Sequence, residues 1–117
     1  MTKETMRVAI PVANGLLCQH FGHCEQFALF EVSPENGELI QTRLVAPPEH
    51  APGVLPQWLQ RLGVEVVIAG GMGSRAQALF RQAGIRVITG APSRPAEEIV
   101  KDYVAGTLVT GDNACDH

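Results

Sequence analysis

Cysteine and histidine side chains gather at two places that lie far apart in the sequence. They are the stretch "CQHFGHCE" (residues 18–25) and the chain ending "NACDH" (residues 113–117), and of three cysteines and four histidines only His50 lies elsewhere. Thiolates and imidazoles are the ligands that zinc, copper and iron–sulfur clusters prefer. The candidate metal ligands are therefore Cys18, His20, His23, Cys24, Cys115 and His117.

Each of the two places also has a simpler interpretation. Neither pair in the first stretch has zinc-finger spacing, and Cys18 and Cys24 are equally consistent with small buried apolar residues. Cys115 and His117 are separated by one residue, which lets both point to one side of an extended segment, as ligands would need to. A chain terminus can also carry such a pair by accident.

A glycine loop, "GGMGSRA" (residues 70–76), lies between a predicted strand and a predicted helix. Its glycines match the dinucleotide-binding pattern on paper, but the strand before it is not the first, and no carboxylate follows about twenty residues on. Backbone N–H groups at a helix N-terminus, with Arg75 beside them, make an anion site. A tight turn that needs glycine for its backbone angles is the alternative. Arg94 follows a later strand and either faces the same anion or is an ordinary solvated side chain.

Apolar runs and helical patterns alternate along the chain and predict the order β β β α β α β α. A hairpin signal, Asn36-Gly37, joins the second and third strands. We therefore expect a five-stranded mixed sheet, the first three strands antiparallel and the last two parallel to the first, with helices on both faces. The predicted strands cover residues 7–12, 26–32, 39–45, 64–70 and 85–90, and the predicted helices 54–63, 74–84 and 94–106. The strand at 26–32 has apolar residues on both of its alternating faces, the strands at 64–70 and 85–90 are predicted to be buried, and Ser74 is placed to cap the helix that begins there.

Composition limits the classes of protein that fit. The 117 residues, 45% of them hydrophobic, predict a single domain (1–117) with a flexible tail from about residue 107. A net charge of −3 without a basic run argues against nucleic-acid binding. No stretch resembles a signal peptide or a membrane span, so we expect a cytoplasmic, monomeric protein with reduced thiols.

Three stretches together carry a resemblance: "HFGHCEQFALFEV", the strand–"GGMGSRA"–helix unit and the closing "CDH". They resemble the dinitrogenase iron–molybdenum cofactor biosynthesis family over nearly the whole chain. Members of that family include nitrogenase accessory proteins that carry metal–sulfur clusters and the molybdenum–copper orange protein of anaerobes. The resemblance implies an α/β fold similar to ribonuclease H, with a five-stranded mixed sheet.

The resemblance also implies a function: non-catalytic binding, storage or delivery of an anionic metal–sulfur cluster of the Mo-Cu-S or Fe-Mo-S type. The partner would be a protein that donates or accepts the cluster. Two alternatives remain, a protein that binds single Zn or Cu ions and a metal-free regulatory domain that binds a partner. The residues implied around a cluster are Asn14, Phe21, Gly71, Met72, Gly73, Ser74, Arg75 and Arg94.

Two kinds of catalyst fit poorly. A nuclease of the ribonuclease H type needs carboxylates on its central strands to hold magnesium, and the first predicted strand has none. A hydrolase with a Cys–His pair needs an oriented third group, and none is evident. We expect that the protein is not an enzyme.

Overall fold

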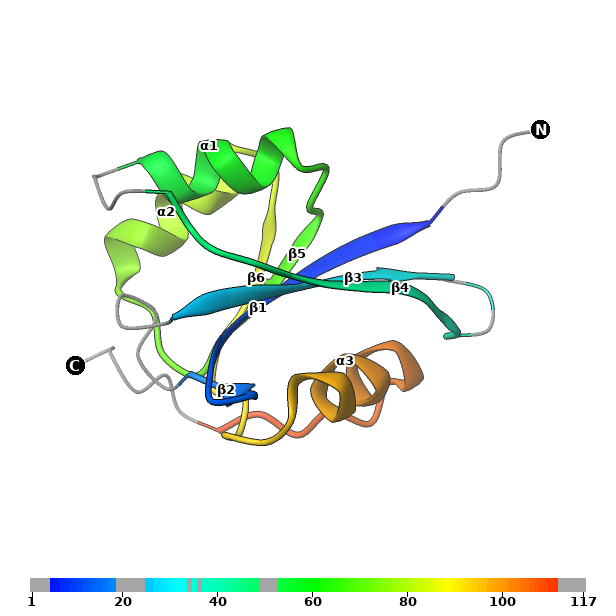
Figure 1. Cartoon of the computed structure of the whole chain (residues 1–117). Coiled ribbons are helices and arrows are strands. Elements are labelled where there is room, and N and C mark those ends of the chain that lie inside the picture. Colours follow the sequence, from blue (N-terminus) through cyan, green and yellow to red (C-terminus); the bar gives the residue numbers. More distant parts are fainter. Residues whose placement is uncertain (1–4, 19–24, 34, 36, 49–52, 112–117) are drawn as a thin grey trace.

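The computed structural model describes residues 5–18, 25–33, 35, 37–48 and 53–111. The described residues form a mixed sheet with helices on both of its faces (Figure 1). The strands are β1 (Met6–Ala13), β2 (Leu16–Leu17), β3 (Gln26–Val32), β4 (Leu39–Val45), β5 (Val66–Ile68) and β6 (Arg86–Ile88), and the helices are α1 (Val54–Arg61), α2 (Ser74–Gln82) and α3 (Ala96–Ala105).

The sheet has the order β4-β3-β1-β5-β6, and the short β2 pairs with β1 outside that order. β1, β3 and β4 are antiparallel neighbours, while β5 and β6 run parallel to β1, which confirms the predicted mixed pattern. The prediction of five strands is wrong, because β2 makes a sixth. It returns along β1 after Asn14 and Gly15, whose positive φ angles of 54° and 80° fit a two-residue hairpin turn. The Asn36 of the predicted second hairpin lies outside the described residues.

The side chains of β3 alternate between two apolar cores, as its sequence predicted. Ala28, Phe30 and Val32 point into the core beneath α3, whereas Phe27 and Leu29 point into the core beneath α1 and α2. Burial on both faces explains why β1 is apolar over most of its length. The three helices close these cores through the buried residues Leu55 and Leu59 of α1, Phe80 of α2, and Ala96, Ile99 and Val100 of α3.

Two local predictions are wrong. β6, predicted to be buried, is an edge strand whose Arg86 is exposed and whose other two residues are half-buried. Ser74 was predicted to cap α2, but Gly73 occupies the cap position with an extended backbone, and no side chain caps this helix end. In the part of the chain that the structure describes, no helix is long and apolar enough to cross a membrane.

Candidate functional site

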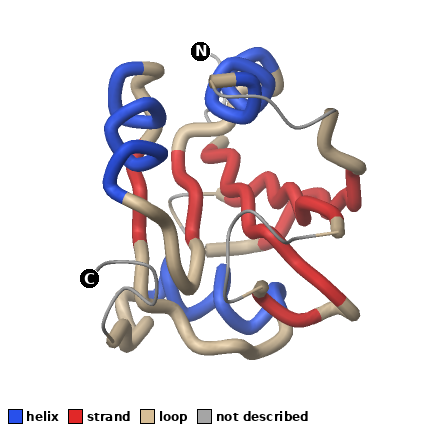
Figure 2. Tube along the Cα trace, turned by 90° about the vertical axis from the view of Figure 1, so that its left-hand side faces the viewer, coloured by secondary structure: helices blue, strands red, loops and turns tan. Residues whose placement is uncertain are grey.

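The ends of the parallel strands β1, β5 and β6 lie at one edge of the sheet, and Figure 2 looks onto this edge. Ligands of open α/β sheets bind outside the carboxyl ends of the strands, where the connecting segments meet. The segments that follow these three strands begin at Asn14, Ala69 and Thr89. We call this region the carboxyl edge.

Hydrogen bonds tie the segment after β1 to the segment after β6. The Leu17 N–H donates to the Arg94 carbonyl at 2.9 Å, and the Ser93 hydroxyl donates to the Leu17 carbonyl at 2.9 Å. The Cys18 N–H donates to the Pro11 carbonyl at 2.8 Å, and the Cys18 side chain is half-buried. The structure thus fixes the first cysteine of the sequence motif at the carboxyl edge.

Backbone hydrogen bonds between glycines join the segments after β5 and β6 to the beginning of the tail. The Gly90 N–H donates to the Gly70 carbonyl at 2.8 Å, and the Gly111 N–H donates to the Gly90 carbonyl at 2.7 Å. Gly90 has a φ of +82°, and a Cβ at this position would overlap the Gly111 carbonyl oxygen. Only glycine allows the chain to pass this closely. The tail therefore leaves the described structure at the same edge that holds Cys18 and the glycine loop.

The N-terminus of α2 is open to an anion. Ser74 and Arg75 are exposed, no acidic residue lies in the first turn, and no side chain caps the helix. Arg75 forms no ion pair with the residues that the structure describes. The free N–H groups and the helix dipole favour negative charge at such an end.

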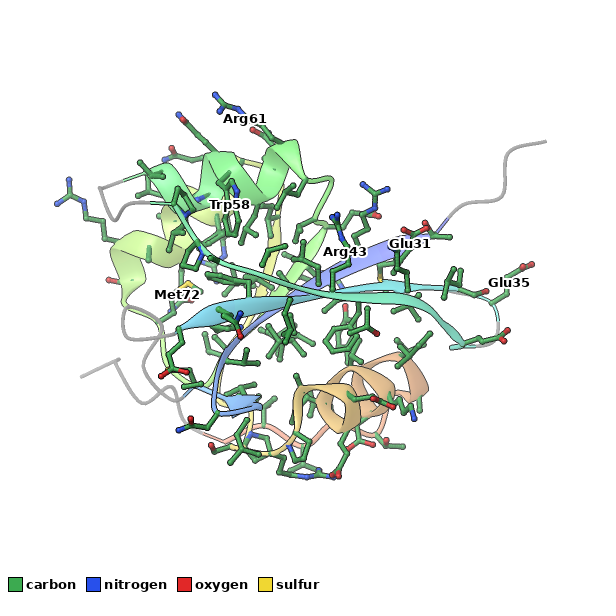
Figure 3. All side chains as sticks on the ribbon, viewed as in Figure 1. Glu31, Glu35, Arg43, Trp58, Arg61 and Met72 are labelled. Atoms are coloured by element: carbon green, nitrogen blue, oxygen red, sulfur yellow. The ribbon has the colours of Figure 1, made fainter. Side chains whose placement is uncertain are left out.

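Side chains of α2 stabilise the glycine loop that precedes this helix. The Gln77 side-chain amide donates to the Met72 carbonyl at 2.8 Å, and Arg81 donates to the Gln77 side-chain oxygen at 3.3 Å. The Met72 side chain is fully buried in the core beneath α1 and α2, and Figure 3 shows it between α2 and the sheet. The prediction that Met72 surrounds a cluster does not fit this burial, because its apolar side chain anchors the loop instead.

The Arg94 side chain, for which the sequence left an anion contact and an ordinary solvated position open, is engaged by α3. Its guanidinium donates to the Glu98 carboxylate at 2.6 Å and to the Asp102 carboxylate at 3.2 Å, both on α3. These partners raise the pKa of Arg94 above its ordinary value, and the hydrogen bond to Glu98 has the largest effect. Its backbone carbonyl, and not its charge, contributes to the carboxyl edge.

Asn14 contributes backbone geometry to the site. It lies exposed in the β1–β2 turn, and its N–H approaches the Glu25 carboxylate at 3.4 Å. Five predicted metal ligands lie outside the described residues, namely His20, His23, Cys24, Cys115 and His117. Phe21, predicted to lie beside a cluster, is outside them as well. No group of three or more potential metal ligands occurs among the described residues.

Sequence reasoning missed two residues that shape the edge, Gln77 and Ser93. The signal for Gln77 was present, because "SRAQ" has the Ser-x-x-Gln spacing of a helix start. This spacing correctly indicates the N-terminus of α2. Gln77 does not bond back to a capping Ser74, however, because its side chain donates to the Met72 carbonyl of the preceding loop. Nothing in the sequence distinguishes Ser93 from an ordinary loop serine.

The described part of the carboxyl edge offers two kinds of contact at once. The α2 N-terminus and Arg75 suit negative charge, and the Cys18 thiol is a soft donor for a metal. Glu25, the acidic residue nearest to the turn, lies exposed beside Asn14. This donor set fits a small anion that contains soft metals better than a hard cation such as Mg²⁺ or Ca²⁺, which binds oxygen ligands and usually several carboxylates.

Comparisons with known proteins agree with this fold. A model of the family described as "Dinitrogenase iron-molybdenum cofactor" matches residues 4–106. The uncharacterized protein MJ0580 of Methanocaldococcus jannaschii is 32% identical over 110 residues, which cover 90% of this chain and 91% of that protein.

Solved structures show the same arrangement. The crystal structure of PH0822 is similar with a TM-score of 0.81 and 30% identity, over 90% of this chain and 94% of the other. The apo form of the orange protein from Desulfovibrio gigas has a TM-score of 0.69 and 20% identity, over 96% of this chain and 98% of the other. At that identity, the second likeness concerns the fold alone.

Proposed function

The chain belongs to the dinitrogenase iron-molybdenum cofactor family, and from this premise we propose that it binds an anionic metal–sulfur cluster. It stores the cluster or delivers it to an acceptor protein, and it catalyses no reaction. The cluster, of the Mo-Cu-S or Fe-Mo-S type, is the cargo of the protein. A donor or acceptor of the cluster is the partner that this role requires.

One observation carries the proposal: the N-terminus of α2, uncapped and with an Arg75 that no described residue pairs with, opens on the edge that also holds Cys18. A metal–sulfur cluster presents negative sulfides outside and soft metals inside. The N–H groups of α2 and the Arg75 guanidinium bind the sulfides. The thiols and imidazoles predicted from the sequence bind the metals, and Cys18 is the described member of that set.

The charges of α1 and α2 favour the approach of an anion. Neither helix contains an Asp or a Glu, although the chain as a whole has a net charge of −3. Their three arginines are Arg61, Arg75 and Arg81. An excess of one sign of charge around a site raises the local concentration of the oppositely charged ligand.

The sheet order supports a ribonuclease H-like classification without the chemistry of that enzyme. β1 lies at the centre, with an antiparallel hairpin on one side and parallel β5 on the other. Neither β1 nor β5 carries an Asp or a Glu. A nuclease would need such carboxylates to hold its metal ions, which favours a carrier over a catalyst.

The test is cluster uptake in the absence of oxygen. The full-length protein is incubated with tetrathiomolybdate and Cu(I), freed of unbound reagents by gel filtration, and analysed for molybdenum, copper and sulfide. We expect a coloured protein with molybdenum and copper in a fixed ratio to the chain. A protein that stays colourless and free of molybdenum, yet takes up stoichiometric Zn²⁺ in a parallel incubation with a zinc salt, would support the single-ion alternative and overturn the proposal.

A further inference from the structure

The two edges of the sheet differ in how they are protected. Edge strands expose unpaired N–H and C=O groups, and proteins usually keep them short, charged or interrupted by proline. β6 follows this rule, with three residues that include the exposed Arg86. β4 is less protected, because it has seven residues, no proline and one charged side chain, Arg43, and the β-bulge that interrupts its pairing lies near its beginning, between Leu39 and Gln41. Within the described residues, no strand pairs with its outer side.

β4 also exposes large apolar side chains. Ile40 and Leu44 are 46% and 60% exposed. Leu44 is paired with Ala28, whose side chain faces the core beneath α3, so Leu44 lies on the α3 face of the sheet. Ile40 lies four residues earlier on the same face. On the opposite face, β4 carries the polar residues Gln41 and Arg43, and Figure 3 shows Arg43 on the side of the sheet that faces α1.

The β4 sequence, "LIQTRLV", has a symmetric pattern about Thr42. Equal steps outward from Thr42 pair the polar Gln41 with Arg43, and then Ile40 with Leu44. The pattern ends there, because a β-bulge follows between Gln41 and Leu39 and places Leu39 against the core beneath α3, whereas Val45 packs against the core beneath α1 and α2. We propose that β4 is an interface for a second copy of this chain, which adds its own β4 antiparallel about a two-fold axis at Thr42. The same surface then meets itself, as a two-fold dimer requires, and one sheet continues through both copies.

This register is favoured over its neighbours. A register centred on Arg43 sets the two Arg43 guanidiniums directly opposite each other, and like charges in that arrangement are destabilising. A register centred on Gln41 sets Leu44 opposite Glu38 and leaves its apolar surface unpaired. A shift by one residue would bring apolar and polar faces together. Only the Thr42 register joins Ile40 to Leu44 twice on the α3 face.

The dimer does not depend on cluster binding and does not obstruct it. The carboxyl edge lies at the ends of β1, β5 and β6, whereas the second copy joins along the length of β4, at the other side of the sheet. A two-fold axis perpendicular to the sheet places the two carboxyl edges at opposite ends of the continuous sheet. Both therefore stay accessible to a cluster.

The experiment is sedimentation equilibrium of the full chain at concentrations from about 5 to about 500 µM, the range suited to a small interface. We expect a monomer–dimer equilibrium. Leu44→Lys should abolish the dimer, and Val109→Lys should leave it unchanged, because Val109 is 79% exposed but lies on the tail segment. A wild-type protein that stays monomeric throughout, or a dimer that tolerates Leu44→Lys, overturns the proposal.

A second variant tests the register and keeps the fold. Within one copy, Gln41→Arg sets an arginine opposite Glu31, which stabilises the folded monomer. Across the proposed interface, the same arginine lies opposite Arg43 of the second copy, and the repulsion destabilises the dimer. Two such repulsive contacts should weaken the dimer about two- to thirtyfold. The thermal midpoint at low concentration should not fall. Unchanged dimer affinity would show that β4 does not pair in this register.

Discussion

Replacing Gly90 with alanine should detach the tail from the carboxyl edge and leave the sheet folded. The substitution has two separate costs. Gly90 has a φ of +82°, where a Cβ costs about 1–2 kcal/mol. The new methyl group would also overlap the Gly111 carbonyl, so the tail must move and the hydrogen bond between Gly111 and Gly90 is lost, at about 1 kcal/mol.

Gly84 provides the matched control for this substitution. It has the same φ of +82°, and a Cβ there would meet nothing within 4 Å. Gly84→Ala therefore has only the backbone cost, about 1–2 kcal/mol. The difference between the two variants, about 1 kcal/mol, measures the contact between the tail and the sheet.

The assay is urea unfolding followed by the fluorescence of Trp58, the single tryptophan, whose ring contacts Phe27 at a centroid distance of 5.6 Å. Hydrogen exchange of the Gly111 amide, measured by NMR, gives the second readout. Exchange should accelerate in Gly90→Ala and not in Gly84→Ala. Equal losses of stability in the two variants, with equal protection of the Gly111 amide, would refute the reasoning.

Three further substitutions test other parts of the structure. Phe80→Ala removes a fully buried ring and should lower the free energy of unfolding by about 3–5 kcal/mol in urea titrations, and a loss below about 1 kcal/mol would contradict its place in the core. Arg94→Gln should leave cluster uptake unchanged, because this guanidinium is engaged by α3; reduced uptake would restore the original prediction for Arg94. Gln77→Leu releases the Met72 carbonyl and should speed the loss of cluster after gel filtration, with the urea midpoint little changed; unaltered retention would mean that the loop needs no such support.

The fold was largely predictable because its signals are local and repeat along the chain. β3 and β4 begin and end where the alternating apolar residues do, and each helix starts near its predicted residue. The missed β2 has only two residues, too few for a periodic pattern, although Asn14-Gly15 was a hairpin signal. The exposure of β6 depends on its place at the edge of the sheet, which its apolar sequence alone does not reveal.

The site was less predictable, because side-chain direction depends on contacts between distant segments. Met72 stands in a glycine loop that suggests a ligand site, yet its neighbours in space are core residues of α2 and the sheet. Arg94 is drawn to Glu98 and Asp102, which lie one and two turns further along α3. Arg75 has no such partner among the described residues, and it is therefore the arginine that the structure leaves available at the carboxyl edge.

The most direct test of the central claim compares cluster retention in Arg75→Gln and Arg61→Gln. Both variants remove one exposed arginine from the same helix layer, but Arg75 lies in the first turn of α2, and Arg61 is the last residue of α1, at the end that leads towards β5. After loading with tetrathiomolybdate and Cu(I), the half-life of the visible absorption should fall about tenfold in Arg75→Gln and change less than about twofold in Arg61→Gln. Equal half-lives in the two variants and the wild type would contradict an anion site at the N-terminus of α2.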